Sequence, residues 1–129
     1  MSLRNYATTL YSWLSNYAPV FREPVIFDAD NPQPNEYITY SASTSGFAEQ
    51  FIQPITIYSK STGFTELMQI VDFIESAIGE SGAVIGNNEW GYISIFKGSP
   101  FYQDKPEEDE SYRAGYINLL VTIYQKGEL

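Results

Sequence analysis

The sequence predicts an α+β fold, in which two helices pack on one face of a mixed, mostly antiparallel sheet. Two segments repeat their apolar residues with the period of a helix, and six shorter segments are rich in β-branched and aromatic residues. The predicted order of elements is α-β-β-β-α-β-β-β. With 43% hydrophobic and 18% charged residues among 129, the chain is expected to form a single domain over residues 1–129.

Each expected helix carries one apolar stripe, which we expect to pack on the sheet. The first helix is expected over residues 2–17, with Ser2 as its N-cap and Pro19 just beyond its end. Its stripe consists of Leu3, Tyr6, Leu10, Trp13, Leu14 and Tyr17. The second helix ends at Gly79 or Gly82. Its stripe consists of Phe64, Leu67, Ile70, Val71, Ile74 and Ile78.

Six segments are expected to be strands. They are Pro24–Asp28, Tyr37–Ala42, Phe51–Ser59, "AVIG" from Ala83, "GYISIF" from Gly91 and Tyr112–Tyr124. Pro54 lacks a backbone donor, which predicts an edge strand or a bulge. The turn "NNEW" predicts a hairpin between the fourth and fifth strands, and Lys97–Ser111 is expected to be a long polar loop. In the last strand, Ile117, Leu119, Val121 and Ile123 point to one face.

The composition excludes several kinds of site. The chain contains no histidine and no cysteine, so it cannot build a zinc site from those ligands or a Ser-His or Cys-His nucleophile. Its net charge is −9, with only seven basic residues, which disfavours binding to nucleic acid. No apolar run is long enough to span a membrane. We therefore expect no catalytic residue, no metal and no cofactor.

The acidic run near the C-terminus is the main candidate for chemistry. It comprises Asp104, Glu107, Glu108, Asp109 and Glu110. The run has neither the glycine nor the alternating ligands of a calcium loop, and nothing in the sequence fixes two carboxylates across a cleft. We therefore interpret it as a solvated loop. Asp28 and Asp30 have the spacing of a metal pair, but a turn in which Asp28 binds nearby backbone is the better interpretation.

Aromatic residues make up 16% of the chain and include eleven tyrosines, more than a core of this size uses. Tyrosine and tryptophan are favoured at protein interfaces, because they combine an apolar ring with a polar tip. Some of these side chains are therefore expected to be exposed. An exposed aromatic patch on a small acidic domain indicates contact with another protein.

Most of the chain resembles the tail terminator family of long-tailed phages and prophages, also called tail completion or minor capsid proteins. The resemblance rests on "IQPITIYSKSTGFTELMQIVDFIESAI" and "GYISIFKGSPFYQDKPEEDESYRAGYINLLVTIY". The family is characterised by a strand that enters a helix through a Ser/Thr-Gly turn. A hairpin, a "KGSPF"-like segment, a variable polar loop and a long last strand follow.

The resemblance implies a structural protein of the virion, made in the cytoplasm of a bacterial host. Its copies form a ring that caps the tail tube, ends tube growth and joins the tail to the head. The implied partners are other copies of the chain, the tail tube protein and the head–tail connector protein, with DNA only passing through the lumen. One edge of the subunit would contain Lys97, Phe101, Tyr102 and Arg113, and the facing edge Asn88 and Trp90.

The size of the chain favours a hexamer if DNA passes through the ring. A domain of this length has a radius of gyration of about 14 Å, which corresponds to a sphere roughly 36 Å across. Six touching spheres leave a hole of about 36 Å, whereas three leave about 6 Å, too narrow for a duplex. Two alternatives remain open. One is another neck protein, such as a head completion or adaptor protein, and the other is a domain that binds a small ligand in a pocket between the second helix and the sheet.

Overall fold

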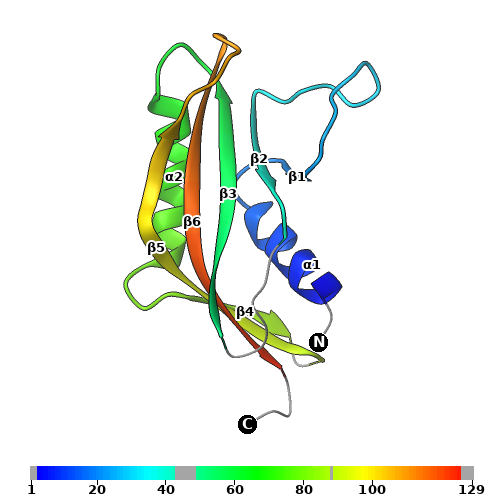
Figure 1. The fold of residues 1–129 in the computed structure, drawn as a ribbon, viewed down its shortest axis with the longest axis vertical. Coiled ribbons are helices and arrows are strands. Elements are labelled where there is room, and N and C mark those ends of the chain that lie inside the picture. Colours follow the sequence, from blue (N-terminus) through cyan, green and yellow to red (C-terminus); the bar gives the residue numbers. More distant parts are fainter. Residues whose placement is uncertain (1–2, 43–48, 88, 126–129) are drawn as a thin grey trace.

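The computed structural model describes residues 3–42, 49–87 and 89–125, which form two helices and six strands (Figure 1). The elements are α1 (Leu3–Leu14), β1 (Val20–Arg22), β2 (Glu36–Tyr40), β3 (Gln50–Lys60), α2 (Thr65–Ile78), β4 (Ala83–Asn87), β5 (Gly91–Lys105) and β6 (Tyr112–Gln125). The strands form one sheet with the order β1-β2-β3-β6-β5-β4. β1 and β2 pair in parallel, and all other neighbours pair antiparallel. The predicted α+β class with a mixed, mostly antiparallel sheet is therefore confirmed.

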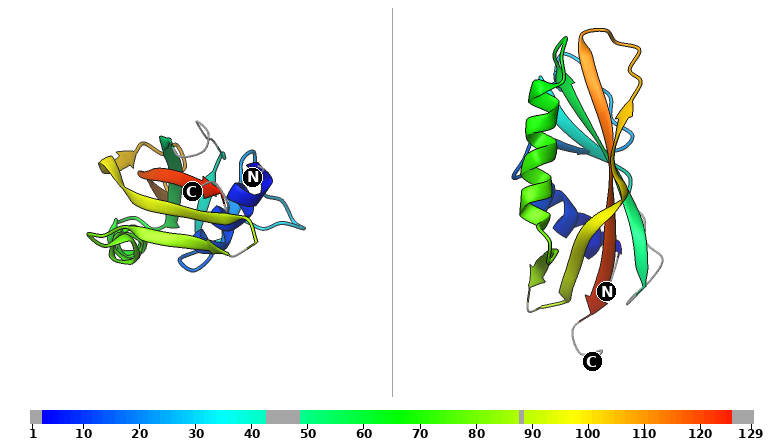
Figure 2. Two further views of the ribbon diagram at one scale, coloured as in Figure 1. Left: turned by 90° about the horizontal axis from the view of Figure 1, so that it is seen from below. Right: turned by 90° about the vertical axis from the view of Figure 1, so that its left-hand side faces the viewer.

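The sheet is strongly curled, and the two helices pack on different parts of it (Figures 1 and 2). α2 lies against the three long strands β3, β5 and β6. α1 lies against β1 and β4, which are the two edge strands of the sheet. Because the sheet curls, its two edges approach the same helix. The prediction that both helices pack on one face is therefore wrong in detail, since α2 covers the three long strands and α1 contacts the two edge strands.

One core cluster joins both helices to the sheet. Tyr6, Leu10, Trp13 and Leu14 of α1 are buried, as are Leu67, Ile70, Val71, Ile74 and Ile78 of α2. The Tyr6 ring meets Phe51 edge to face at 5.6 Å, and its hydroxyl donates to the Gln53 side chain at 2.8 Å. The predicted stripes are therefore core at these positions. Tyr17 lies beyond the end of α1 and is half-buried, and Phe64 lies before α2 and is 42% exposed. The side chain of Leu3 lies outside the described part of the structure. Ser2 lies outside the described residues.

The first strand is three residues long and lies earlier in the chain than predicted. Val20–Arg22 pairs with β2, whereas Pro24–Asp28, the predicted strand, has no strand pairing. Pro24 cannot donate to a ladder, and the Asp28 carboxylate accepts the backbone N–H groups of Asp30 and Asn31 in a local turn. The turn interpretation of Asp28 is thus confirmed, and the strand prediction is wrong.

Pro54 does not mark an edge strand, since β3 lies between β2 and β6. The pairing with β2 ends at Ile55, so Pro54 faces only Asn118 of β6. The missing N–H of Pro54 therefore removes no hydrogen bond between β2 and β3. The strand is interior, but it is unpaired on one side at the position where proline occurs.

The predicted polar loop Lys97–Ser111 is for the most part strand. β5 continues to Lys105 and pairs with β6 on both sides of an irregularity between Lys97 and Tyr102. β6 is long enough to pair with both ends of β5. Gly115 of β6 leaves room for the Tyr102 ring. Only residues 106–111 connect the two strands.

Candidate functional site

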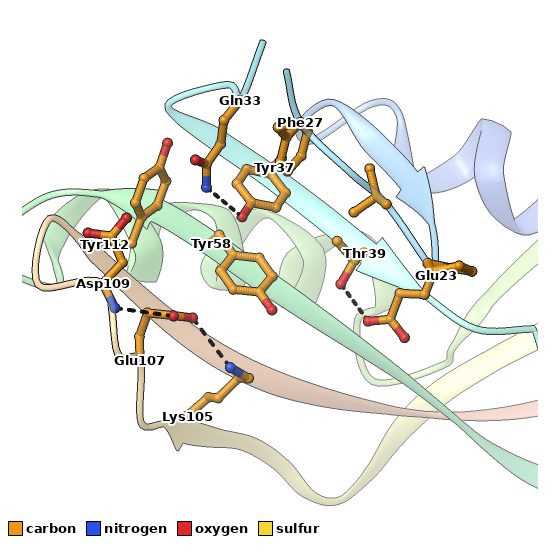
Figure 3. Close-up of a pocket in the computed structure, with 12 residues that line it drawn as sticks. Glu23, Phe27, Gln33, Tyr37, Thr39, Tyr58, Lys105, Glu107, Asp109 and Tyr112 are labelled. Atoms are coloured by element: carbon orange, nitrogen blue, oxygen red, sulfur yellow. Dashed lines mark hydrogen bonds and ion pairs between the residues drawn. The ribbon is translucent and has the colours of Figure 1, made fainter. Parts of the chain in front are cut away.

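A cavity of about 570 Å³ lies on the outer face of the sheet, which we define as the face opposite the helices (Figure 3). Along β3, Ile55 and Ile57 point into the core, whereas Tyr58 points outward. Tyr58 pairs with Tyr37 of β2 on one side and with Ala114 of β6 on the other. Side chains from β2, β3, the end of β5 and the start of β6 form its floor, and residues 23–33 form one wall. We call this cavity the outer pocket.

Four aromatic rings line the outer pocket and contact one another. Tyr37 and Tyr58 are cross-strand partners whose rings stack at 4.6 Å. Phe27 and Tyr112 each meet the Tyr37 ring edge to face, at 5.1 Å and 6.0 Å. The Tyr112 hydroxyl donates to the Pro34 carbonyl at 2.7 Å, which ties the wall to β6. The rings therefore form a fixed apolar floor with polar tips.

Charged side chains surround these rings. Lys105 lies 5.4 Å from the centre of the Tyr58 ring and forms an ion pair with Glu107 at 3.3 Å. Glu23 accepts a hydrogen bond from the Thr39 hydroxyl at 2.9 Å, and Asp109 forms the far rim. Figure 3 shows the Glu23 carboxylate, the Tyr58 hydroxyl and the Lys105 ammonium directed toward the same space.

Burial and these charges shift several pKa values. Burial raises the pKa of Tyr37 to about 12, and it also raises the pKa of Tyr58 against the opposing effect of Lys105. Partial burial alone would lower the pKa of Lys105, but Tyr58 and Glu107 outweigh it and raise the pKa. Lys105 is therefore charged at neutral pH, and the pocket carries three carboxylates against one ammonium.

The acidic run is not uniformly solvated, as the sequence suggests. The Glu107 side chain is only 21% exposed, pairs with Lys105 and lines the outer pocket, whereas Glu108, Asp109 and Glu110 are exposed. Alternation in β2 and β3 placed Tyr37 and Tyr58 on strands, but no local signal indicated that Phe27 or Glu23 would join them. These residues meet only because the 23–33 segment folds over β2.

The predicted edge around Lys97 does not form one exposed surface. Lys97 forms an ion pair with Glu75 of α2 at 3.4 Å, so it points toward the helix side. Phe101 and Tyr102 are half-buried and pack against the core, and the Tyr102 hydroxyl donates to Asp104 at 2.7 Å. These side chains contribute to subunit packing as well as to any contact surface.

Arg113 and Trp90 lie at opposite ends of β6. The Arg113 guanidinium donates to the Thr62 carbonyl at 2.9 Å and lies over the Phe64 ring at 5.8 Å. Trp90 precedes β5 and packs half-buried against the core. The register places Tyr102 opposite Ile117 and Gly91 opposite Gln125, so Tyr102 and Gly91 lie about 26 Å apart along β6. Asn88 lies outside the described residues.

A second surface on the outer face is apolar, and we call it the outer patch. It consists of Ile52, Val84, Tyr92, Phe96, Leu120 and Tyr124. Phe96, Leu120 and Ile52 are aligned across β5, β6 and β3, and Tyr92 stacks on Tyr124 at 4.8 Å. Val84 is 70% exposed and Ile52 46% exposed, so this face presents apolar side chains in a group and not singly.

A cavity of about 410 Å³ lies beside α2. Gln69 and Phe73 of the helix line one side of it, and Tyr17–Pro19 and Pro34–Glu36 line the other. It is smaller than the outer pocket, and no charged pair crosses it among the described residues. The larger of these two cavities therefore lies on the face away from α2, and not between α2 and the sheet, where the alternative hypothesis of a ligand-binding domain predicts a pocket.

In the described part of the chain, no group of three or more acidic side chains is arranged to hold a metal ion. No helix there has the length and apolarity needed to cross a membrane.

Comparison with models of known protein families finds no match to this chain, and comparison with curated proteins finds none.

Proposed function

We propose that the protein is a tail terminator of a long-tailed phage or prophage, whose copies form a six-membered ring. The ring caps the tail tube, stops its growth and presents a surface to the head–tail connector, while DNA passes through the lumen. The observation that carries the proposal is the outer patch. Burial of exposed apolar area stabilises association by about 25 cal/mol per Å², and this face offers several large side chains in register.

A closed ring requires a heterologous contact, in which one edge of a subunit meets a different edge of the next. Trp90 lies at the hairpin end of the sheet, next to the Tyr92 and Tyr124 rows of the outer patch. Tyr102, which follows Phe101, lies about 26 Å from Gly91 along β6. Two separated edges of one subunit fit a heterologous contact better than a two-fold symmetric one.

Sedimentation velocity over a range of concentrations tests self-association. We expect the wild-type protein to form a ring-sized species at high concentration. Phe96→Asp places a charge in the outer patch and should shift the species toward monomer. The control is Tyr11→Asp on the exposed side of α1, which introduces the same charge outside the patch and should associate as the wild type does.

Tail tubes grown from purified tube protein of the same phage test the role. The protein should cap tube ends and halt growth, and Val84→Asp or Phe96→Asp, at exposed positions of the outer patch, should weaken capping while the subunit stays folded by circular dichroism. A protein that remains monomeric at high concentration and does not engage tube ends is not a terminator. Binding to the portal instead of the tube would assign the protein to the other neck components.

A further inference from the structure

The outer pocket combines aromatic rings with uncompensated negative charge, a combination that the ring proposal does not use. Glu107 is paired with Lys105, but Glu23 and Asp109 form no ion pair within the described part of the chain. The pocket therefore carries a net charge of about −2 beside the stacked rings of Tyr37 and Tyr58. Such surroundings attract a cation that offers a flat or apolar side.

Lys105 shows how the pocket accommodates a cation. Its ammonium lies over the Tyr58 ring and bonds to Glu107, so one cation from the chain itself already uses one ring and one carboxylate. Glu23 lies on the other side of the Tyr58 hydroxyl from Lys105. One oxygen of the Glu23 carboxylate accepts a hydrogen bond from the Thr39 hydroxyl. The other oxygen of Glu23 can accept a hydrogen bond from a further donor, and the cavity in front of Phe27 has room for that donor.

We propose that the outer pocket binds an arginine side chain presented by another protein. A guanidinium suits the pocket better than an ammonium, because it is planar, stacks on aromatic rings and donates two parallel hydrogen bonds to a carboxylate. Tyr37 and one face of Tyr58 are covered, so the half-buried Phe27 ring and the edge of Tyr58 provide the aromatic surface, and Glu23 provides the carboxylate. A protein source is favoured because the chain as a whole has a net charge of −9, which draws basic partner surfaces toward it.

The test is an NMR titration of the full chain with N-acetyl-L-arginine amide, which has a side chain but no terminal charges. We expect saturable shifts confined to residues around the outer pocket. The matched probe N-acetyl-L-citrulline amide has nearly the same shape without the charge, and it should bind at least tenfold more weakly, as the loss of a charge-assisted bond predicts. Equal binding of the two probes would overturn the proposal.

Three variants locate the site. Glu23→Gln should weaken binding of the arginine probe by about tenfold, because the amide keeps the shape and removes the charge. Glu80→Gln, an exposed carboxylate between α2 and β4, is the control and should change nothing. Lys105→Met should strengthen binding several-fold, since it frees Glu107 and the Tyr58 ring. If Lys105→Met weakens binding while the fold is retained, the proposed geometry is wrong.

The source of the guanidinium is tested with free L-arginine. A pocket built for a side chain should bind free L-arginine no more tightly than the blocked residue, because the pocket would not recognise the terminal groups. Tighter binding of free L-arginine would identify a free amino-acid ligand and overturn the assignment to a partner protein. These titrations use the subunit at low concentration, so their outcome is independent of whether the ring forms.

Discussion

Tyr37 shows how a single residue connects the sheet to the outer pocket. Its backbone belongs to β2, its ring stacks on Tyr58, and its hydroxyl accepts a hydrogen bond from the Gln33 side chain at 3.0 Å. Only 5% of the residue is exposed, so ionisation would place a negative charge among rings and near Glu107. The native state therefore requires this tyrosine to be neutral.

This requirement predicts that the protein loses stability at alkaline pH. The pKa of Tyr37 is about 12 in the folded chain, against 10.0 for an ordinary tyrosine, so the folded state holds this proton more tightly. The contribution of the neutral Tyr37 side chain to the free energy of unfolding is complete below pH 10 and is lost as the pH rises from 10 to 12. The free energy of unfolding, measured with urea, should fall less between pH 9 and pH 11 for Tyr37→Phe than for the wild type. An equal fall in both would show that Tyr37 does not contribute.

At the scale of elements, α2 and its three strands form the most regular part of the molecule. Five residues of α2 at helical spacing are buried against β3, β5 and β6, and Gly79 ends the helix with a φ of 63°, a conformation that glycine adopts readily. The opposite side of the helix carries Phe73, which is 62% exposed. The helix is therefore a clear case of one buried and one solvent-facing side.

Substitutions on the two sides of α2 should have very different effects. Leu67→Ala or Ile74→Ala, at fully buried positions, should lower the free energy of unfolding by about 2–5 kcal/mol, because each leaves a cavity in the core. Phe73→Ala should change it by less than about 0.5 kcal/mol. Chemical denaturation of the three variants measures this difference. A small effect of Ile74→Ala would contradict the packing of α2 on the sheet.

At the scale of the whole molecule, negative charge and exposed apolar surface act in opposite directions. A net charge of −9 keeps copies apart, while the outer patch favours their contact. The curl of the sheet brings both edge strands near α1 (Figure 2). Which of the two effects dominates depends on ionic strength.

Added salt should therefore promote self-association. Between about 0.05 and 0.5 M salt, screening shortens the range of repulsion between acidic subunits to a few ångströms, while apolar contacts persist. The weight-average mass at fixed concentration should rise with salt in sedimentation equilibrium. Binding of the arginine probe to the outer pocket should weaken over the same range, because it depends on attraction between opposite charges. A mass that falls with salt would mean that charge pairs, and not the outer patch, hold the copies together.

The sequence by itself determined the α+β class, the buried stripes of both helices and the alternation of the last strand. These features follow from periodicity within one segment, which is a local property. The absence of histidine and cysteine likewise excluded whole classes of site without any structure. The proposed terminator role also rests on the sequence, through its resemblance to that family.

Only the tertiary structure decided where the strands pair and what the outer pocket contains. Val20–Arg22 becomes a strand because β2 lies beside it, and Pro54 is tolerated inside the sheet because β2 ends at Ile55. Tyr37 and Tyr112, 75 positions apart in the chain, meet across β3 because of the strand order. Periodicity tells which face a side chain points to, but it does not encode which strands are neighbours, and the pocket depends on that order.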